Sequence, residues 1–277
     1  MLDASSSLLS LAKGCDHPSG TVRCYALDQP LEETCEGCDP PANYLRRVSP
    51  SPQVSGTLNN MIIPSVLSTD LSFVQEELLD LEQLDPTPQR IQVDIIDGEF
   101  APELTIDAEQ LRELNLPSIA LDIHFMTLDP TDFIPTLRGM TTIKTVIAQI
   151  ERLHSQQEFV EEALATHFEA GFSLDLYTPF ESLEEIWLSE LSIVQIMGGK
   201  AGQQGQEFRS QVLEKIQEAA EYKRQHQLKY EIVIDIGMNP DTIPLAKKAG
   251  ADHFVVGSYL QHGNPQEQWE RLLEAEV

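Results

Sequence analysis

Two apolar segments of this chain carry an aspartate close to where a buried strand should end. They cover residues 91–98 (Ile-Gln-Val-Asp-Ile-Ile-Asp-Gly) and 231–237 (Glu-Ile-Val-Ile-Asp-Ile-Gly), and the aspartates of interest are Asp94 and Asp235. A carboxylate among Val and Ile side chains is costly to bury without a partner, so both positions are expected to face a site. Two such aspartates on different strands are typical of a pair of proton-transfer bases.

The elements that must position these aspartates alternate strand with helix from Met61 onward. Eight β-branched, apolar runs predict strands over 61–67, 91–96, 119–125, 143–149, 172–177, 192–197, 230–236 and 253–257. Helical spacing predicts helices over 70–84, 107–114, 131–137, 156–170, 180–190, 207–227, 241–249 and 265–275. Asp70 and Asp241 are expected capping residues, and Gly171 and Gly250 are expected to end helices.

This alternation predicts a (β/α)8 TIM barrel. The 217 residues that follow residue 60 (277 minus 60) leave about 27 residues for each strand and helix, which suits a compact barrel. A doubly wound open sheet is the alternative. It would usually carry a Gly-rich phosphate turn after its first strand, and the segment 64–68 (Pro-Ser-Val-Leu-Ser) is not such a turn.

In a barrel, the carboxyl ends of the strands meet at one mouth, where barrel enzymes do their chemistry. The predicted strand ends carry polar side chains at Ser65, Ser68, Gln92, Asp94, Asp97, Asp122, His124, Asp175, Gln195, Asp235 and Ser258. The last three strands lead into loops with small residues, among them Gly202, Gly205, Gly237 and Gly257. Glycines let backbone N–H groups approach an anion closely, so a phosphorylated small molecule is the expected ligand.

Composition excludes some classes of partner. The net charge is −27, from 45 acidic and 18 basic residues. The chain therefore lacks the Lys and Arg surface that a nucleic-acid-binding protein needs to contact phosphates. No apolar stretch approaches the ~20 residues that cross a bilayer, which argues against a membrane protein. The N-terminus also lacks the basic-then-apolar order of a secretory signal, so a cytoplasmic location is expected.

Residues 1–60 differ from the rest, which gives two expected domains: an N-terminal extension over 1–60 and a barrel domain over 61–277. The extension holds all four cysteines, Cys15, Cys24, Cys35 and Cys38, and little apolar periodicity. Unligated thiols in a disordered tail and a small zinc-binding segment are both open, with the former favoured by the irregular spacing. A true gene start at Met61 is a third alternative.

Several of these segments, taken together, resemble the ribulose-phosphate 3-epimerase family. They are 63–70 (Ile-Pro-Ser-Val-Leu-Ser-Thr-Asp), 93–98 (Val-Asp-Ile-Ile-Asp-Gly), 100–106 (Phe-Ala-Pro-Glu-Leu-Thr-Ile), 122–126 (Asp-Ile-His-Phe-Met) and 202–208 (Gly-Gln-Gln-Gly-Gln-Glu-Phe). The resemblance implies a (β/α)8 barrel that inverts one carbon of a phosphorylated ketose. It assigns Asp94 and Asp235 as the catalytic acid and base on opposite faces of an enediolate.

The resemblance also implies a divalent metal ion (Zn, Fe, Mn or Mg) held by two histidines and the two catalytic aspartates. Gln92 stands where one of those histidines is expected, so Asp94, His124 and Asp235 remain as metal ligands. An amide oxygen is a poorer zinc ligand than imidazole and suits a harder ion such as Mg²⁺ or Mn²⁺.

The implied contacts with substrate and phosphate lie at the mouth. They are Ser65, Met126, Met197, Gly202, Gly205, Gly237, Gly257 and Ser258. The strand 145–149 lacks the His that is usual in the family, and Ile236 replaces a glycine. Glu99 and Glu103 add negative charge that would repel a phosphosugar at the mouth. Lys200 could offset that charge by pairing with phosphate, or be an ordinary solvated loop lysine.

Three functions therefore remain. The first is an epimerase of the ribulose 5-phosphate/xylulose 5-phosphate class, and the second is a non-catalytic phosphosugar-binding barrel that has lost part of its metal site. The third is another lyase or isomerase on the same barrel. Barrels of this type often associate through their outer helices, so a homo-oligomer is compatible with the sequence.

Overall fold

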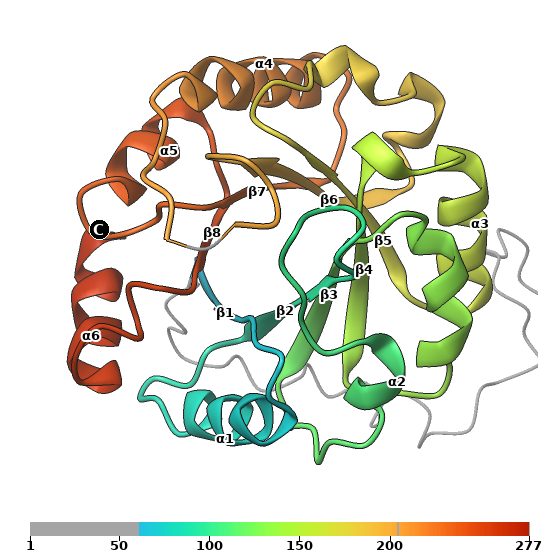
Figure 1. The fold of residues 1–277 in the computed structure, drawn as a ribbon. Helices are drawn as coiled ribbons and strands as arrows, with labels where there is room; N and C mark the ends of the chain where they lie inside the picture. Colours follow the sequence, from blue (N-terminus) through green and yellow to red (C-terminus); the bar gives the residue numbers. More distant parts are fainter. Residues whose placement is uncertain (1–60, 204, 277) are drawn as a thin grey trace, which may run out of the picture. The chain divides into compact units, whose positions relative to one another are not determined.

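The computed structural model describes residues 61–203 and 205–276, which form a closed barrel of eight parallel strands (Figure 1). Each strand pairs with the next one along the chain, and β8 pairs with β1. The strands are β1 (Ile62–Val66), β2 (Arg90–Ile96), β3 (Ala120–Met126), β4 (Ile143–Gln149), β5 (Glu169–Leu174), β6 (Leu191–Met197), β7 (Glu231–Asp235) and β8 (His253–Val256). The predicted barrel is confirmed, whereas the cysteines of the predicted extension lie outside the described residues.

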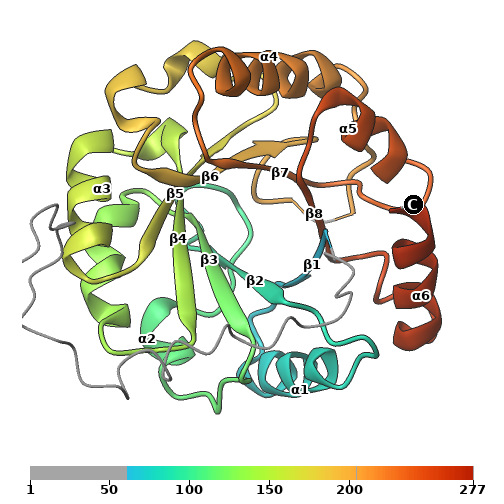
Figure 2. The same cartoon turned by 180° about the vertical axis from the view of Figure 1, so that it is seen from behind.

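Helices surround the barrel, as the view from behind also shows (Figure 2). The α-helices are α1 (Leu71–Glu82), α2 (Ala108–Leu111), α3 (Gln156–Ala165), α4 (Val212–Gln225), α5 (Ile243–Ala249) and α6 (Pro265–Ala275). Short 3₁₀ helices occupy η2 (Pro130–Leu137), η3 (Ile150–Arg152), η4 (Phe180–Ser182) and η5 (Glu185–Trp187). In the described part of the chain, none of the helices combines the length and the apolar character needed to cross a bilayer.

Two of the predicted α-helices, over 131–137 and 180–190, are 3₁₀ helices instead. Pro135 lies inside η2, where it removes a backbone donor that an α-helix needs. The segment after residue 179 breaks into η4 and η5, which are three residues each. These short elements still bury apolar side chains against the barrel, among them Ile134 and Phe180.

Two expected helix boundaries also need correction. Gly171 does not end a helix but lies within β5, and α3 ends earlier, at Ala165. A Cβ at Gly171 would lie 3.0 Å from Ile193 Cβ and 3.1 Å from Ile147 Cγ1, so glycine leaves room for the side chains of neighbouring strands. Asp241 is not a cap either, because the capping position of α5 belongs to Thr242, whose side chain makes no capping bond.

The other two boundary predictions are confirmed. Asp70 caps α1 by accepting hydrogen bonds from the N–H groups of Ser72 and Phe73. Gly250 ends α5 with φ 115°, a left-handed conformation that glycine adopts without steric cost.

The interior of the barrel is closed on its amino-terminal side by an ion-pair network. Arg90 Nε donates to Asp122 Oδ2 at 2.7 Å, and Arg90 Nη1 donates to Glu231 Oε2 at 2.5 Å. His253 Nε2 lies 3.4 Å from Glu231 Oε1. Three of these residues begin their strands, so the network lies at the end opposite the mouth. Asp122, which the sequence suggested for the mouth, is therefore a structural residue paired with Arg90.

This network makes a prediction about acid stability. The hydrogen bond from His253, together with the charges of His253 and Arg90, lowers the pKa of Glu231 to about 2. A carboxylate with a lowered pKa stabilises the fold above its ordinary pKa, and this contribution is lost as the pH falls toward 2. Glu231→Gln should therefore have a lower free energy of unfolding than the wild type, as measured by urea denaturation. The difference between the two proteins should be largest above about pH 5 and smaller near pH 3. A difference that does not change with pH would contradict this role.

Candidate active site

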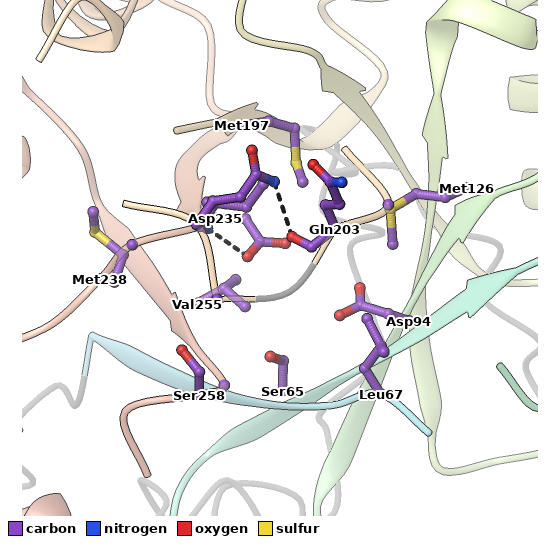
Figure 3. A pocket seen from close by; sticks show the side chains of 16 residues that line it. Ser65, Leu67, Asp94, Met126, Met197, Gln203, Asp235, Met238, Val255 and Ser258 are labelled. Atoms are coloured by element: carbon purple, nitrogen blue, oxygen red, sulfur yellow. Dashed lines mark hydrogen bonds between the residues drawn. The ribbon is translucent and has the colours of Figure 1, made fainter. Parts of the chain in front are cut away.

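A cavity opens at the carboxyl ends of the strands and collects most of the predicted site residues (Figure 3). Asp94 enters it from β2 and Asp235 enters it from β7. The other predicted residues that line it are Ser65, Met126, Met197, Gly202, Gly205, Gly237, Gly257 and Ser258. His124 does not line the cavity but lies next to Asp94 on β3, where the two residues are register partners.

The two aspartates belong to one hydrogen-bonded cluster. Gln92 Nε2 donates to Asp94 Oδ1 at 2.8 Å and to Asp235 Oδ2 at 3.0 Å. His124 Nδ1 lies 3.0 Å from Asp94 Oδ1 and 3.9 Å from Asp235 Oδ2. Because Gln92 and Asp94 are two residues apart on one strand, their side chains point to the same face. The amide group of Gln92 therefore joins β2 to β7, two strands that do not pair with each other.

His124 is fully buried and held from two sides. Its Nε2 lies 3.1 Å from Gln149 Oε1, an acceptor that keeps the proton on that nitrogen and directs Nδ1 toward the aspartates. Burial alone would lower the pKa of His124, but the hydrogen bond and charge of Asp94, together with the charge of Asp235, raise the pKa above its ordinary value. Gln149 is thus the residue that orients the imidazole.

Asp235 is a carboxyl group with a strongly altered proton affinity. Burial and the nearby negative charge of Asp94 raise the pKa of Asp235 to about 7. The amide of Gln195 lies 3.4 Å from Asp235 Oδ2 and 3.2 Å from His124 Nδ1. A carboxyl group with a pKa near neutrality can both take up and release a proton at physiological pH, as a general acid and base must.

The same cluster fits a divalent metal ion. One ligand atom from each of Asp94, His124 and Asp235 lies within 4.8 Å of the other two, and all three residues are buried. Two carboxylate oxygens and an imidazole nitrogen are ligands for divalent ions such as zinc, manganese and iron. In the part of the chain that the structure describes, this group could hold a metal ion.

The other half of the cavity is built from backbone turns. Gly237 has φ 75°, and a Cβ there would lie 2.4 Å from the backbone nitrogen of Phe208. A Cβ at Gly257 would lie 2.7 Å from Ser65 Oγ, so the strand ends approach closely. None of the described residues that line the cavity is Lys or Arg. An anion bound in this half would therefore rely on backbone N–H groups and on the hydroxyl groups of Ser65 and Ser258.

Ile236 adopts a strained backbone conformation beside Asp235. Its φ is 77°, a left-handed value that is uncommon for a β-branched residue, and it stands where the resembled family has glycine. Its N–H donates to Asp235 Oδ1 at 2.7 Å, and its side chain packs with the apolar residues around the mouth. The strained turn thus fixes the direction of the Asp235 carboxyl group.

Comparisons with known proteins agree with this geometry. Residues 61–261 match the model of the ribulose-phosphate 3 epimerase family. The ribulose-phosphate 3-epimerase of Bacillus subtilis is 31% identical over 205 residues, which are 71% of this chain and 90% of the relative. The cytoplasmic isoform from Oryza sativa subsp. japonica is 30% identical over 203 residues, 72% of this chain and 86% of the relative. This chain belongs to the ribulose-phosphate 3-epimerase family.

Solved structures show the same fold. A mutant tryptophan synthase alpha-subunit from Pyrococcus furiosus superposes with a TM-score of 0.56 at 16% identity, covering 78% of this chain and 97% of that one. The alpha subunit of tryptophan synthase from Campylobacter jejuni gives a TM-score of 0.53 at 14% identity, with 78% and 96% covered. At these identities the likeness concerns the barrel alone.

Several residues in which the sequence departs from the epimerase family lie outside the cavity. Lys200 is exposed, and neither it nor Glu99 nor Glu103 lines the cavity. Asp97 accepts hydrogen bonds from the N–H groups of Glu99 and Phe100 at 2.8 Å, and it therefore positions the loop after β2.

Asp175 has a structural role as well. Its Oδ1 accepts a hydrogen bond from the N–H of Leu176 at 2.7 Å, and its backbone carbonyl accepts one from Lys215 Nζ at 2.6 Å.

Among the described residues, the cavity also contains side chains that sequence reasoning did not assign. These are Leu67, Gln203, Gln206, Ile236, Met238 and Val255.

The glycine turn gives a prediction with a matched control. In Gly237→Ala the new methyl group meets the Phe208 backbone, so the turn must shift. The affinity for inorganic phosphate should then fall about tenfold or more, which is the loss expected when one charge-assisted hydrogen bond is removed. Gly139 has a similar φ of 86°, but a Cβ there meets nothing within 4 Å. Gly139→Ala therefore introduces the same backbone strain without the clash. Calorimetric titration with phosphate that gives equal losses in both variants would contradict the assignment.

Proposed function

We propose that this barrel inverts the carbon next to the carbonyl of a phosphorylated ketose of the ribulose 5-phosphate/xylulose 5-phosphate class. The observation that carries the proposal is the placement of Asp94 and Asp235, which reach one cavity from different strands and are joined through Gln92. Membership of the ribulose-phosphate 3-epimerase family supports the choice of reaction and of substrate.

The two aspartates exchange one proton each with the substrate. In one direction, the Asp94 carboxylate removes the proton from the carbon next to the carbonyl, and the electron pair moves into an enediolate. Asp235 in its protonated form, which its raised pKa makes accessible, then delivers its own proton to the opposite face of that carbon. The enzyme is left with the proton on Asp94 instead of Asp235, which is the state that runs the reaction in reverse.

The negative charge of the enediolate must be offset inside a buried site. A divalent ion held by Asp94, His124 and Asp235 would supply positive charge to the enediolate oxygens. Gln149 keeps His124 in the orientation that presents Nδ1 to the cavity side. Met126 and Met197 are buried at the mouth beside Ile96 and Ala101, where they exclude water from the reacting carbon.

The phosphate group occupies the glycine-rich half of the cavity in this proposal. Gly202, Gly205, Gly237 and Gly257 line that half, where glycines let backbone N–H groups approach an anion closely, and Ser65 and Ser258 add hydroxyl groups. A phosphate held there fixes the distance from the anion to the reacting carbon and so orients the sugar between the two aspartates.

The test is the conversion of ribulose 5-phosphate into its C3 epimer. The purified protein is incubated with ribulose 5-phosphate and with Mn²⁺, Mg²⁺, Zn²⁺ or Fe²⁺ in turn, and the two sugars are quantified by NMR. We expect xylulose 5-phosphate to appear with at least one ion. Binding of ribulose 5-phosphate without conversion under every condition would contradict the proposal and favour the non-catalytic phosphosugar-binding barrel.

A further inference from the structure

The amide of Gln92 occupies an unusual place between the two aspartates. The side chain is almost completely buried, at 1% exposure, and its Nε2 lies 2.8 Å from Asp94 Oδ1 and 3.0 Å from Asp235 Oδ2. Ionised carboxylates only accept hydrogen bonds, whereas an amide NH₂ group has two donors. The NH₂ group must therefore face the aspartates, because the amide oxygen in its place would repel both of them.

In this position, the amide NH₂ group of Gln92 stabilises the two carboxylates, as a bound cation would. Each of its two N–H bonds satisfies one carboxylate, at the point where both carboxylates lie closest to His124. Unpaired, these buried carboxylates would be costly, because charge in an apolar interior needs a partner. A half-turn of the amide about its terminal bond exchanges the nitrogen for the oxygen without moving the rest of the side chain.

We propose that Gln92 alternates between two roles: its NH₂ group bridges Asp94 and Asp235 in the metal-free protein, and its amide oxygen becomes a fourth protein ligand when a divalent ion binds. The inference rests on the proposed function in that the ion serves the same site. Asp235 keeps a donor in the metal-bound form, because the Gln195 amide lies 3.4 Å from its Oδ2.

A glutamine ligand in place of histidine changes how strongly the site prefers Zn²⁺ over Mn²⁺. With Gln92, the ligands are three oxygens and one nitrogen, whereas a histidine at this position would give two oxygens and two nitrogens. Zn²⁺ gains more than Mn²⁺ from an imidazole nitrogen, and Mn²⁺ tolerates oxygen ligands. Zn²⁺ still binds more tightly in absolute terms, by the general order of divalent ions, but the ratio of the Zn²⁺ to the Mn²⁺ affinity is smaller than with histidine.

Three substitutions separate the two roles in the full-length protein after treatment with a chelator. Gln92→Met removes both the donor and the ligand, Gln92→Glu keeps an oxygen ligand but loses the donor, and Gln92→His supplies an imidazole. Gln217→Met is the matched control, since Gln217 is exposed on α4. Affinities for Mn²⁺ alone and Zn²⁺ alone are measured by calorimetry, and the melting temperature is measured without metal.

We expect Gln92→Met and Gln92→Glu to lower the metal-free melting temperature by about 4 °C or more, because the aspartates lose their donor. The Mn²⁺ affinity should fall about tenfold or more in Gln92→Met and be retained in Gln92→Glu. The ratio of Zn²⁺ to Mn²⁺ affinity should rise about tenfold or more in Gln92→His. Gln217→Met should match the wild type throughout.

Two results would overturn the inference. One is a Gln92→Met protein with the wild-type Mn²⁺ affinity. The other is a Zn²⁺ to Mn²⁺ ratio that is the same in wild type and Gln92→His, a comparison that does not depend on the stability of Gln92→Met. These measurements use no sugar phosphate. A protein that binds the ions as expected but does not convert ribulose 5-phosphate would contradict the proposed function and leave the role of Gln92 intact.

Discussion

Replacing Asp94 or Asp235 with asparagine should lower the turnover of ribulose 5-phosphate by about 10³-fold or more, since each loses its only proton-transfer group. Asparagine keeps the shape of the side chain, and the phosphate half of the cavity is formed by glycine turns and serine hydroxyl groups and not by the two aspartates. The affinity for inorganic phosphate should therefore stay close to that of the wild type. Steady-state kinetics and phosphate titration measure the two quantities on the same preparations.

A carboxylate outside the cavity provides the control for this pair. Glu99 is exposed and does not line the cavity, so Glu99→Gln removes one negative charge without touching the proposed chemistry. Its turnover should remain within a few-fold of wild type. Turnover near the wild-type level in Asp94→Asn or Asp235→Asn would show that the acid and base have been assigned to the wrong residues.

Arg90→Met should be the most destabilising of the substitutions considered, with a loss of about 3–5 kcal/mol in the free energy of unfolding. Asp122 is fully buried, and Arg90 Nη2 and Nε lie 2.6 and 2.7 Å from its Oδ2. Removing the guanidinium leaves that carboxylate without its charge partner in the barrel interior. Urea denaturation near pH 7 measures the change.

The double variant Arg90→Met with Asp122→Leu distinguishes a lost ion pair from lost packing. Removing both partners takes away the buried charge, so the double variant should recover most of the stability that Arg90→Met loses. A double variant as unstable as Arg90→Met alone would show that the loss came from packing of the arginine side chain and not from the isolated Asp122 carboxylate.

The positions of the strands, and the meeting of Asp94 and Asp235 in one cavity, were predictable because both depend on local signals. Runs of Val and Ile mark barrel strands, and a carboxylate inside such a run marks a position that faces a partner. The same signal misplaced Asp122, because an inward-facing aspartate does not reveal which end of the barrel it occupies. That requires the register of β2, β3 and β7, which brings Arg90 to Asp122.

The uncharged part of the site was harder to predict. Gln149 and Gln195 are buried around His124, but an amide in an apolar run gives a weaker signal than a carboxylate. Cavity residues such as Gln203 and Met238 belong to loops whose positions depend on packing between distant segments. Gly171 was mistaken for a helix end because its small size serves contacts with β4 and β6, which no local pattern indicates.

The most direct test of the central proposal is the exchange of the substrate's C3 proton with solvent. Ribulose 5-phosphate is incubated with the protein and Mn²⁺ in D₂O, and deuterium at C3 is followed by NMR and mass spectrometry. Proton removal by one aspartate and delivery by the other predicts deuterium at C3 of the xylulose 5-phosphate that forms. In reactions of Asp94→Asn and Asp235→Asn, no deuterated xylulose 5-phosphate should appear. Ribulose 5-phosphate that binds but gains no deuterium with any divalent ion would contradict the account.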